Sequence, residues 1–584
     1  MRKRRHPTLG LRWLPIPIPG LTIVVLGLVI VLTVGCAGPA IRSQSPEIEA
    51  LAHLEADTKL VGDYTAPWGL NAKRIERPAL ITGLADTGSD PPPGPQRQTL
   101  LADMQARGVV EPAALLASPS TSLSWVHGYL PAGVRKGDRF DIYVEVPADN
   151  DTMSLAGGWL METRLAEMAV IGNTIRDGHE LGIGTGPLLV DPVSGGTLDS
   201  KSKIRARVLG GGVALRDRDM GLVLAADHRS FAMSKRLGDW INRRFHAVIK
   251  GVKRGVANPQ TDRYIALEVP PIYRHNLGRY ICVVQNIAVI EPPGGRHARL
   301  QLLERQLTDP ITAPSAALRL EAIGKEAIPA LRKALESKDG EIRFAAAEAL
   351  AYLGESVAAP QLAEAATSLR SARPAALAAL TVLDDANGVD ALQTLLASRS
   401  AETRYGAFRA LWRMDPDLPL VRGERRGDAC SLHVLDVEGP PLVHATRSIR
   451  PEFVFFGTEH PVADGLRAEA GTSIVVVVDG GTATVSRFIP GQSDQQIEVP
   501  AGADSIVRAI IELGGAYADA IQFLQQANAG RGLASRLAFD ALPDELDGRP
   551  TIHQEASART RDIPEVTDDP PTADDEDREA DDSA

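Results

Sequence analysis

The sequence is poor in aromatic residues and in cysteine: only 4% of its 584 residues are Phe, Trp or Tyr, and three are Cys. The cores must therefore be built from Ala, Val, Leu and Ile, and a small disulfide-dense scaffold is excluded. The apolar run near the start, residues 21–34, is too short to span a bilayer comfortably as a helix, and the overall composition excludes a polytopic membrane protein. At roughly 150 residues per domain, the length predicts about three or four folded units.

Short catalytic signatures are also missing from the sequence. It contains no HExxH, paired CxxC, GxSxG or P-loop spacing, and its 12 His residues are scattered without ligand spacing. The glycine-rich stretches Gly182–Pro187 and Gly210–Gly212 are predicted to be turns, because no amphipathic helix follows that could complete a phosphate site. We therefore expect no catalytic site, no metal, no cofactor and no enzymatic activity.

Asp227 and His228 are adjacent acidic and basic side chains. No nucleophile or third group is spaced to join them in an acid–base site. We expect Asp227 to cap the start of a helix instead.

The net charge of −11 is concentrated at the C-terminus, where residues 562–584 hold eleven acidic side chains and Arg578 as the one basic side chain. Residues 546–584 are also rich in Pro, so they are predicted to form a disordered acidic tail. Nucleic-acid binders usually carry the opposite charge balance, so no nucleic-acid partner is expected.

The N-terminus has the layout of an export signal: basic residues, the apolar run and then Cys36. Residues Thr33–Cys36 resemble the lipobox of bacterial lipoproteins, which makes Cys36 a candidate lipidation site and membrane anchor. An ordinary cleaved signal and an uncleaved anchor are the alternatives, and all three export the chain. Residues 1–35 are assigned to the signal and 36–60 to a linker.

Export places the two remaining cysteines, Cys282 and Cys430, in an oxidising compartment. They are therefore a candidate disulfide pair. Two separate buried thiols are the alternative, because sequence alone does not show whether the Cα atoms approach closely enough for a bridge.

An internal repeat of about 30 residues runs from Ile311 to about Pro416, where the composition shifts toward Ala and Leu. Its register is marked by Leu331, Leu362 and Leu392. This period predicts three full helix pairs and one partial pair, stacked as a solenoid over residues 308–420. An irregular Ala-rich bundle is the alternative, and either form provides a surface for partners.

Residues 339–350 resemble the first helix of a HEAT repeat, in which an Asp near the turn and an Arg one turn later support the stacking of repeats. Asp339 and Arg343 occupy these two positions, and Arg404 repeats the Arg in the segment from Ser400 to Leu411. The block is therefore expected to be HEAT-like.

The flanks of this block have mixed patterns. Residues 139–146 alternate as a half-buried strand should, and 230–248 have a helical apolar stripe formed by Phe231, Leu237, Trp240, Ile241 and Phe245. After the block, 473–478 and 482–488 flank Asp479-Gly480-Gly481, a hairpin signal, and 505–527 predict two helices broken at Gly514-Gly515. The fold class is α+β.

Read in order, the two flanks resemble the bacterial flagellar basal-body P-ring protein family. Segments similar to family motifs follow one another along the chain: Ile81–Asp90, Arg97–Met104, Leu130–Ile142, Ser154–Met161, Gly186–Leu188, Ile241–Phe245, Val507–Ala516 and Asp519–Ala527. The resemblance implies mixed P-ring-type α/β parts at 61–300 and 425–545, interrupted by the all-α HEAT-like solenoid as an insertion.

The same resemblance implies a structural subunit that self-assembles into a ring around the rod in the periplasm and acts as a bushing of the flagellar basal body. The implied partners are other copies of this chain, the rod and L-ring proteins, peptidoglycan, and an unknown protein bound by the HEAT-like insert. The rival hypothesis is a lipid-anchored envelope scaffold that binds partners through its HEAT-like repeats. An enzyme acting on cell-wall material is a third hypothesis, for which no catalytic constellation is found.

Overall fold

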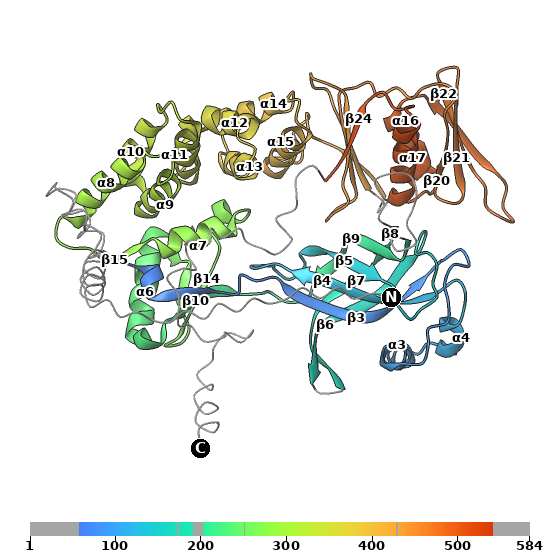
Figure 1. The fold of residues 1–584 in the computed structure, drawn as a ribbon, viewed down its shortest axis with the longest axis horizontal. Coiled ribbons are helices and arrows are strands. Elements are labelled where there is room, and N and C mark those ends of the chain that lie inside the picture. The colour runs from blue at the N-terminus through green and yellow to red at the C-terminus, as the bar shows by residue number, and fades with distance from the viewer. Residues whose placement is uncertain (1–57, 172–173, 191–202, 250–251, 428–429, 541–584) are drawn as a thin grey trace, which may run out of the picture. The chain divides into compact units, whose positions relative to one another are not determined.

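The computed structural model describes residues 58–171, 174–190, 203–249, 252–427 and 430–540. These residues form an α+β fold with four recognisable parts, which follow the colour gradient of the ribbon in Figure 1. The predicted signal, Cys36, the linker before residue 58 and the acidic tail lie outside the described residues.

The first part is a closed sheet built from residues 73–214. Its strand order is β5-β4-β3-β6-β7-β9-β8, and an additional β5–β9 pairing closes it. The strands are β3 (Lys73–Thr82), β4 (Ser122–Leu130), β5 (Arg139–Glu145), β6 (Trp159–Ile171), β7 (Thr174–Pro187), β8 (Leu189–Val190) and β9 (Arg205–Ala214). Two short helices, α3 (Pro95–Ala106) and α4 (Pro112–Leu116), lie between β3 and β4 in the sequence. The alternation predicted for residues 139–146 is confirmed in β5, where Phe140, Ile142 and Val144 are buried.

The glycine-rich stretches correct the sequence prediction, because both are strands and not turns. Gly182 lies in β7 and Gly212 in β9. A Cβ atom on Gly182 would lie 2.8 Å from Cζ of Phe140, and one on Gly212 would lie 2.5 Å from the same ring. The missing side chains therefore make room inside the closed sheet for the buried ring of Phe140.

The second part is discontinuous in sequence. Strand β2 (Thr65–Trp68) pairs with β10 (Met220–Leu224), and β1 (Lys59–Leu60) pairs with β15 (Ala288–Ile290). The remaining elements are β11 (His246–Ile249), β12 (Val252–Gly255), β13 (Ala257–Pro259), β14 (Tyr264–Leu267), α6 (Phe231–Arg244) and α7 (Leu277–Gln285). Residues 58–68 therefore belong to a module made mostly of residues 220–290. In the sequence, the closed sheet lies between these two segments.

Helix α6 ends earlier than the predicted run 230–248, and its N-cap is not the predicted Asp227. Its N-cap is Ser230, whose Oγ accepts a hydrogen bond from Met233 N, so the prediction that Asp227 caps a helix is wrong. Asp227 lies in a single 3-10 turn, Ala226–His228, and makes no side-chain cap. Leu237 and Ile241 are buried as predicted, whereas Phe231 is 59% exposed because it is the first residue of the helix.

The third part is the helical block, which starts before the repeat seen in the sequence. Its helices are α8 (Gly295–Gln306), α9 (Ala313–Ile323), α10 (Ile328–Ala334), α11 (Gly340–Tyr352), α12 (Ala359–Ser368), α13 (Arg373–Val382), α14 (Ala386–Leu395) and α15 (Ala401–Met414). Leu331, Leu362 and Leu392 are fully buried, so the repeat register marks core positions. Asp339 caps α11, and Arg343 donates to the Ser337 carbonyl in the turn before α11 and pairs with Glu364 on α12, the second helix of the same repeat.

The fourth part, residues 424–539, places two helices among two sheets (Figure 1). One sheet has the order β16-β17-β19-β18-β24 and the other β20-β21-β22-β23. The elements are β16 (Glu424–Arg426), β17 (Cys430–Leu435), β18 (Leu442–Ala445), β19 (Glu452–Phe456), β20 (Arg467–Ala470), β21 (Ile474–Asp479), β22 (Thr482–Arg487), β23 (Gln495–Pro500), α16 (Ala503–Glu512), α17 (Tyr517–Ala529) and β24 (Arg536–Phe539). The predicted hairpin at Gly480-Gly481 and the two helices broken at Gly514-Gly515 are both confirmed.

Candidate functional site: the junctions of the helical block

Both ends of the helical block are attached to their neighbours through buried Arg–Glu ion pairs. We call the contact of α7 with α9 and α11 the first junction, and the contact of α15 with β17, β18 and β19 the second junction. One hydrophobic core cluster continues through both, from Val61 through the helical block to Phe456 on β19.

The first junction is centred on Arg279, the third residue of α7. Its Nε and Nη2 donate to Glu321 Oε2 on α9 at 2.9 and 2.6 Å, and its Nη1 lies 2.5 Å from Glu348 Oε2 on α11. Glu321 is fully buried and also accepts a hydrogen bond of 2.5 Å from the hydroxyl of Tyr273. Burial by itself lowers the pKa of Arg279, but the two carboxylates outweigh it and raise that pKa, so Arg279 stays protonated. Burial raises the pKa of Glu321, and Arg279 opposes that shift.

Aromatic rings cover the charges of the first junction. The ring of Tyr352 on α11 stacks on Tyr273 with 4.8 Å between centroids, and the Arg279 guanidinium lies 4.9 Å from the Tyr352 ring. Asn276, the N-cap of α7, donates to the Tyr352 hydroxyl at 3.1 Å. The rings exclude water, which strengthens the interaction between the charges.

The second junction is centred on Arg409 of α15. Its Nη1 donates to Glu452 Oε2 on β19 at 2.9 Å, and the Tyr405 hydroxyl donates to Glu452 Oε1 at 3.0 Å. Arg409 is 4% exposed, yet its Nε and Nη2 find no hydrogen-bond partner among the described residues. Its guanidinium instead lies 4.4 Å from the ring of Trp412. Burial lowers the pKa of Arg409, although Glu452 opposes that shift.

Histidines gather around the second junction. The ring of His444 on β18 stacks on Tyr405 with 3.7 Å between centroids, and His433 Nε2 on β17 lies 3.8 Å from Glu452 Oε2. Burial lowers the pKa of His444 to about 3. His275 lies in the turn just before α7, and burial, and then Arg413, Arg274 and Arg409, lower its pKa to about 4. Both rings are therefore neutral in the folded protein near pH 7.

Arg404 plays a different part from its counterpart Arg343. It is 2% exposed and donates to the backbone carbonyls of Pro440 and Glu438, beyond the helical block. Arg343 thus joins parts of its own repeat, whereas Arg404, at the same repeat position, attaches α15 to the fourth part of the chain.

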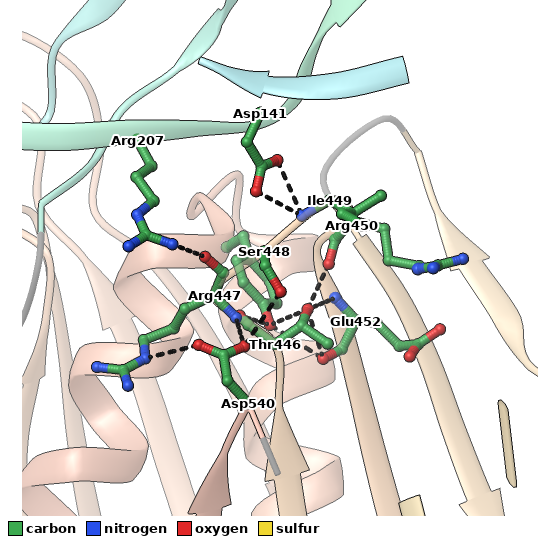
Figure 2. A network of polar contacts seen from close by, with 10 residues as sticks. Asp141, Arg207, Thr446, Arg447, Ser448, Ile449, Arg450, Glu452 and Asp540 are labelled. Carbon is green, nitrogen blue, oxygen red and sulfur yellow. Dashed lines mark hydrogen bonds and ion pairs between the residues drawn. The ribbon is translucent and has the colours of Figure 1, made fainter. Parts of the chain in front are cut away.

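A third junction connects the closed sheet directly to the loop between β18 and β19 (Figure 2). Asp141 on β5 accepts hydrogen bonds from the Gly210 amide at 2.7 Å and from the Ile449 amide at 2.8 Å. Gly210 has φ +55, and a Cβ there would lie 2.1 Å from the Ile449 carbonyl oxygen, so only glycine permits this approach.

The same loop is held from the other side by Asp540, just after β24. Asp540 accepts hydrogen bonds from the Arg447 amide at 2.7 Å and from Arg447 Nε at 3.2 Å (Figure 2). The Arg207 guanidinium on β9 donates to the Arg447 carbonyl at 3.4 Å. The fourth part therefore contacts the closed sheet as well as the helical block, although the block separates them in sequence.

The cysteines are not brought together. Cys282 lies on α7 and Cys430 begins β17, and both are free thiols in the structure, so the candidate disulfide is not present in it. Burial raises the pKa of Cys282 and raises that of Cys430 to about 12. Neither thiol has the depressed pKa of a reactive cysteine.

The described residues contain no cluster of three His, Cys, Asp or Glu side chains that would hold a metal ion. A cavity of about 700 Å³ beside the start of α8 has no Ser, Thr or Cys in its lining, and Arg296 there pairs with Glu291 and Glu326. No helix in the described part of the chain is long and apolar enough to cross a membrane.

Two family models match this arrangement of parts. Residues 69–306 match the flagellar P-ring protein family. This match covers the closed sheet, most of the second part and α8, and it confirms the resemblance over these residues; the similar segments at 507–527 lie beyond it. Residues 298–380 match HEAT repeats, on α8 to α13. No curated protein matches the chain. The P-ring family is structural, so the match supports a structural role in the flagellar basal body.

The junction residues were missed by the sequence reading. Glu321 follows Leu320 in an Ala- and Leu-rich helix, and a charged side chain on an apolar stripe is the one local signal that could have marked it. Glu452 and Arg409 are 43 positions apart, and nothing in either local pattern names the partner.

Proposed function

We propose that this chain is a structural subunit of the flagellar basal-body P ring, which assembles with further copies of itself around the rod in the periplasm and acts as a bushing. The observation that carries the proposal is the continuous P-ring match over residues 69–306, which ends as the HEAT match begins. The partners are other copies of the chain, the rod and L-ring proteins, and peptidoglycan.

A bushing needs a stable shape, and the three junctions supply attachments between the parts of one subunit. Buried Arg–Glu pairs fix the relative position of the elements that carry them, because a buried charge that loses its partner pays an uncompensated desolvation cost. A ring further requires head-to-tail contacts that close on themselves. The work of such a subunit lies in its surfaces, and it needs no catalytic group or cofactor.

In this proposal the HEAT-like block is an insertion, and residues 425–545 continue the P-ring fold after it. The contact of the third junction supports this view, because the loop after β18 meets β5 and β9 across more than 200 residues of sequence. The block then provides an additional surface for a further envelope or flagellar protein.

Purified hook-basal bodies test the proposal. Quantitative mass spectrometry should find this chain at ring-like stoichiometry with the rod proteins, and deletion of its gene should remove the ring. Intact basal bodies that contain no copy of this chain would overturn the flagellar assignment and leave the family match as a record of ancestry.

The second candidate function is a lipid-anchored envelope scaffold that binds proteins through its HEAT repeats. Cys36 and the HEAT match favour it. Metabolic labelling with an alkyne-tagged fatty acid should mark the wild-type chain and not the Cys36→Ser variant. A labelled chain that is absent from basal bodies would favour the scaffold over the ring. An unlabelled chain would show that Cys36 carries no lipid and would contradict the lipid-anchored scaffold.

A further inference from the structure

The paired strands β6 and β7 extend beyond the closed sheet. The last pairing of β6 with β3 is Ala166 with Glu76, and β9 pairs with β7 only at residues 182–184. Between these points β6 and β7 pair only with each other, from Met168 with Asp177 to Ile171 with Thr174. We call residues 167–171 and 174–179 the ribbon.

Within the described part of the chain, both outer edges of the ribbon are unpaired. Its base is fixed by ion pairs, Lys73 with Glu167 and Arg164 with Glu180, the latter at 3.0 Å. Beyond this base no third strand is paired with it in the described part of the chain. A two-stranded hairpin is at best marginally stable alone, and its free backbone groups favour pairing with another strand.

A complementary edge lies in the fourth part of the chain. Strand β23 pairs with β22 along its whole length, from Gln495 with Arg487 to Pro500 with Thr482. No described strand pairs with its other edge, and among the described strands of six or more residues it alone has a partner on one side only. Gln495, Gln496 and Glu498 are exposed.

The edge of β23 lacks most devices that proteins use to protect edge strands. Its register has no bulge and it contains no Lys or Arg, although Pro500 closes one end. Roughly three of its residues present both N–H and C=O outward, the usual template for adding a strand. Among its described strands the closed sheet offers no edge of this length, because β5 pairs with β9 and its one terminal strand, β8, has only 2 residues.

We propose that the ribbon of one copy of this chain adds to the free edge of β23 in a neighbouring copy. The two edges belong to different parts of the chain and are not paired with each other within it, so the contact is head-to-tail between copies. Such a contact propagates from copy to copy and closes as a ring when the rotation permits. The inference rests on the proposed ring function and names the strands that form its interface.

Cysteine cross-linking between two copies that carry different cysteine substitutions tests whether the contact is head-to-tail. Full-length chains carrying either His179→Cys in the ribbon or Gln496→Cys in β23 are produced together in the native cell under mild oxidation. Both positions are exposed. We expect covalent dimers that contain one copy of each variant, and at least a tenfold lower yield when either variant is produced alone.

A matched control replaces the β23 position with Gln393→Cys, an exposed position on α14. Mixed with His179→Cys, it should give no dimers above background. Dimers formed by each variant with itself would indicate a symmetric contact and overturn the proposal.

A second variant removes Met168–Asp177 and joins Glu167 to Gly178 through Asn-Gly. The strand pairs with β3 and β9 lie outside this deletion, so the thermal unfolding of the closed sheet should be unchanged while assembly falls at least tenfold. Normal ring assembly by this variant would overturn the inference and leave the ring function standing. Absence of rings in the wild type would instead overturn the proposed function, and the inference with it.

Discussion

The two junctions of the helical block use the same chemistry but satisfy it to different degrees. At the first, Arg279 meets two carboxylates, and Glu321 receives hydrogen bonds from Arg279 and Tyr273. At the second, Arg409 meets one carboxylate and leaves Nε and Nη2 without partners among the described residues. Unpaired buried donors cost roughly 1–3 kcal/mol, so the first junction should be the stronger attachment and the second the first to open.

The side chains around the two Arg–Glu pairs also differ. Tyrosines cover the first junction, whereas histidines and further arginines surround the second. An excess of positive charge at a buried site disfavours protonation of nearby imidazoles. Acid should therefore act on the second junction, where the neutral ring of His444 stacks on Tyr405.

The largest expected effect is the loss of Arg279. Arg279→Met leaves two carboxylates at a buried site without their cation and should destabilise α9 and α11 by about 3–5 kcal/mol, measured by hydrogen exchange of their amides. Arg332→Met is the control, because its pair with Glu355 has an arginine side chain that is 55% exposed. The control should cost less than about 0.5 kcal/mol. Equal effects would show that burial of the first pair contributes nothing.

Acidification should weaken the second junction by about 3 kcal/mol between pH 7 and pH 4. The pKa of His444 is about 3 in the folded protein, while the unfolded chain takes up its proton near pH 6.5. The unfolded state therefore binds more protons over this window, and stability falls as the pH falls below 6.5. Hydrogen exchange of α15 and β18, corrected for intrinsic rates, measures the change.

His444→Phe keeps a ring beside Tyr405 and removes the titrating group. It should remove the His444 share, about 3 kcal/mol, of the pH dependence of α15, while any contribution of His275, whose folded pKa is about 4, remains. A slope as steep as in the wild type would assign the pH response to another group.

Arg409→Met should lower the free energy of local unfolding of α15 by about 2 kcal/mol. This is less than the effect of Arg279→Met, because Arg409→Met also removes two unpaired buried donors. Local unfolding of α15 in denaturant, followed by hydrogen exchange, gives the value. A cost equal to that of Arg279→Met would contradict the difference between the junctions.

The smallest effects come from the two tyrosine hydroxyls, each worth about 1 kcal/mol. Tyr405→Phe should cost more than Tyr273→Phe, because Glu452 then keeps one strong donor while Glu321 keeps two from Arg279. The pair of substitutions is matched in chemistry, and urea titration of both variants compares them. The reverse order would indicate that the remaining donors do not set the cost.

Local patterns predicted several elements, because the structure of these elements depends on residues close together in the sequence. Alternation placed Phe140 and Ile142 inside, the turn at Gly480-Gly481 predicted its hairpin, and the 30-residue period marked Leu331 as a core position. Gly182 and Gly212 were misjudged because glycine is typical of turns. Their role here is to leave space for Phe140, a residue distant from both in sequence.

By itself the sequence determined the repeat, the periodicities and the ordered motifs that resemble the P-ring family, because each of these is a pattern along the chain that needs no knowledge of spatial contacts. Only the tertiary structure decided that Arg279 meets Glu321, that Arg409 meets Glu452 and that the two cysteines lie on separate elements. A buried charge or a free thiol acquires its partner from long-range packing, whose register no local pattern encodes. The ribbon and the edge of β23 follow the same logic, because an unpaired edge is recognisable only once every other strand has its neighbour.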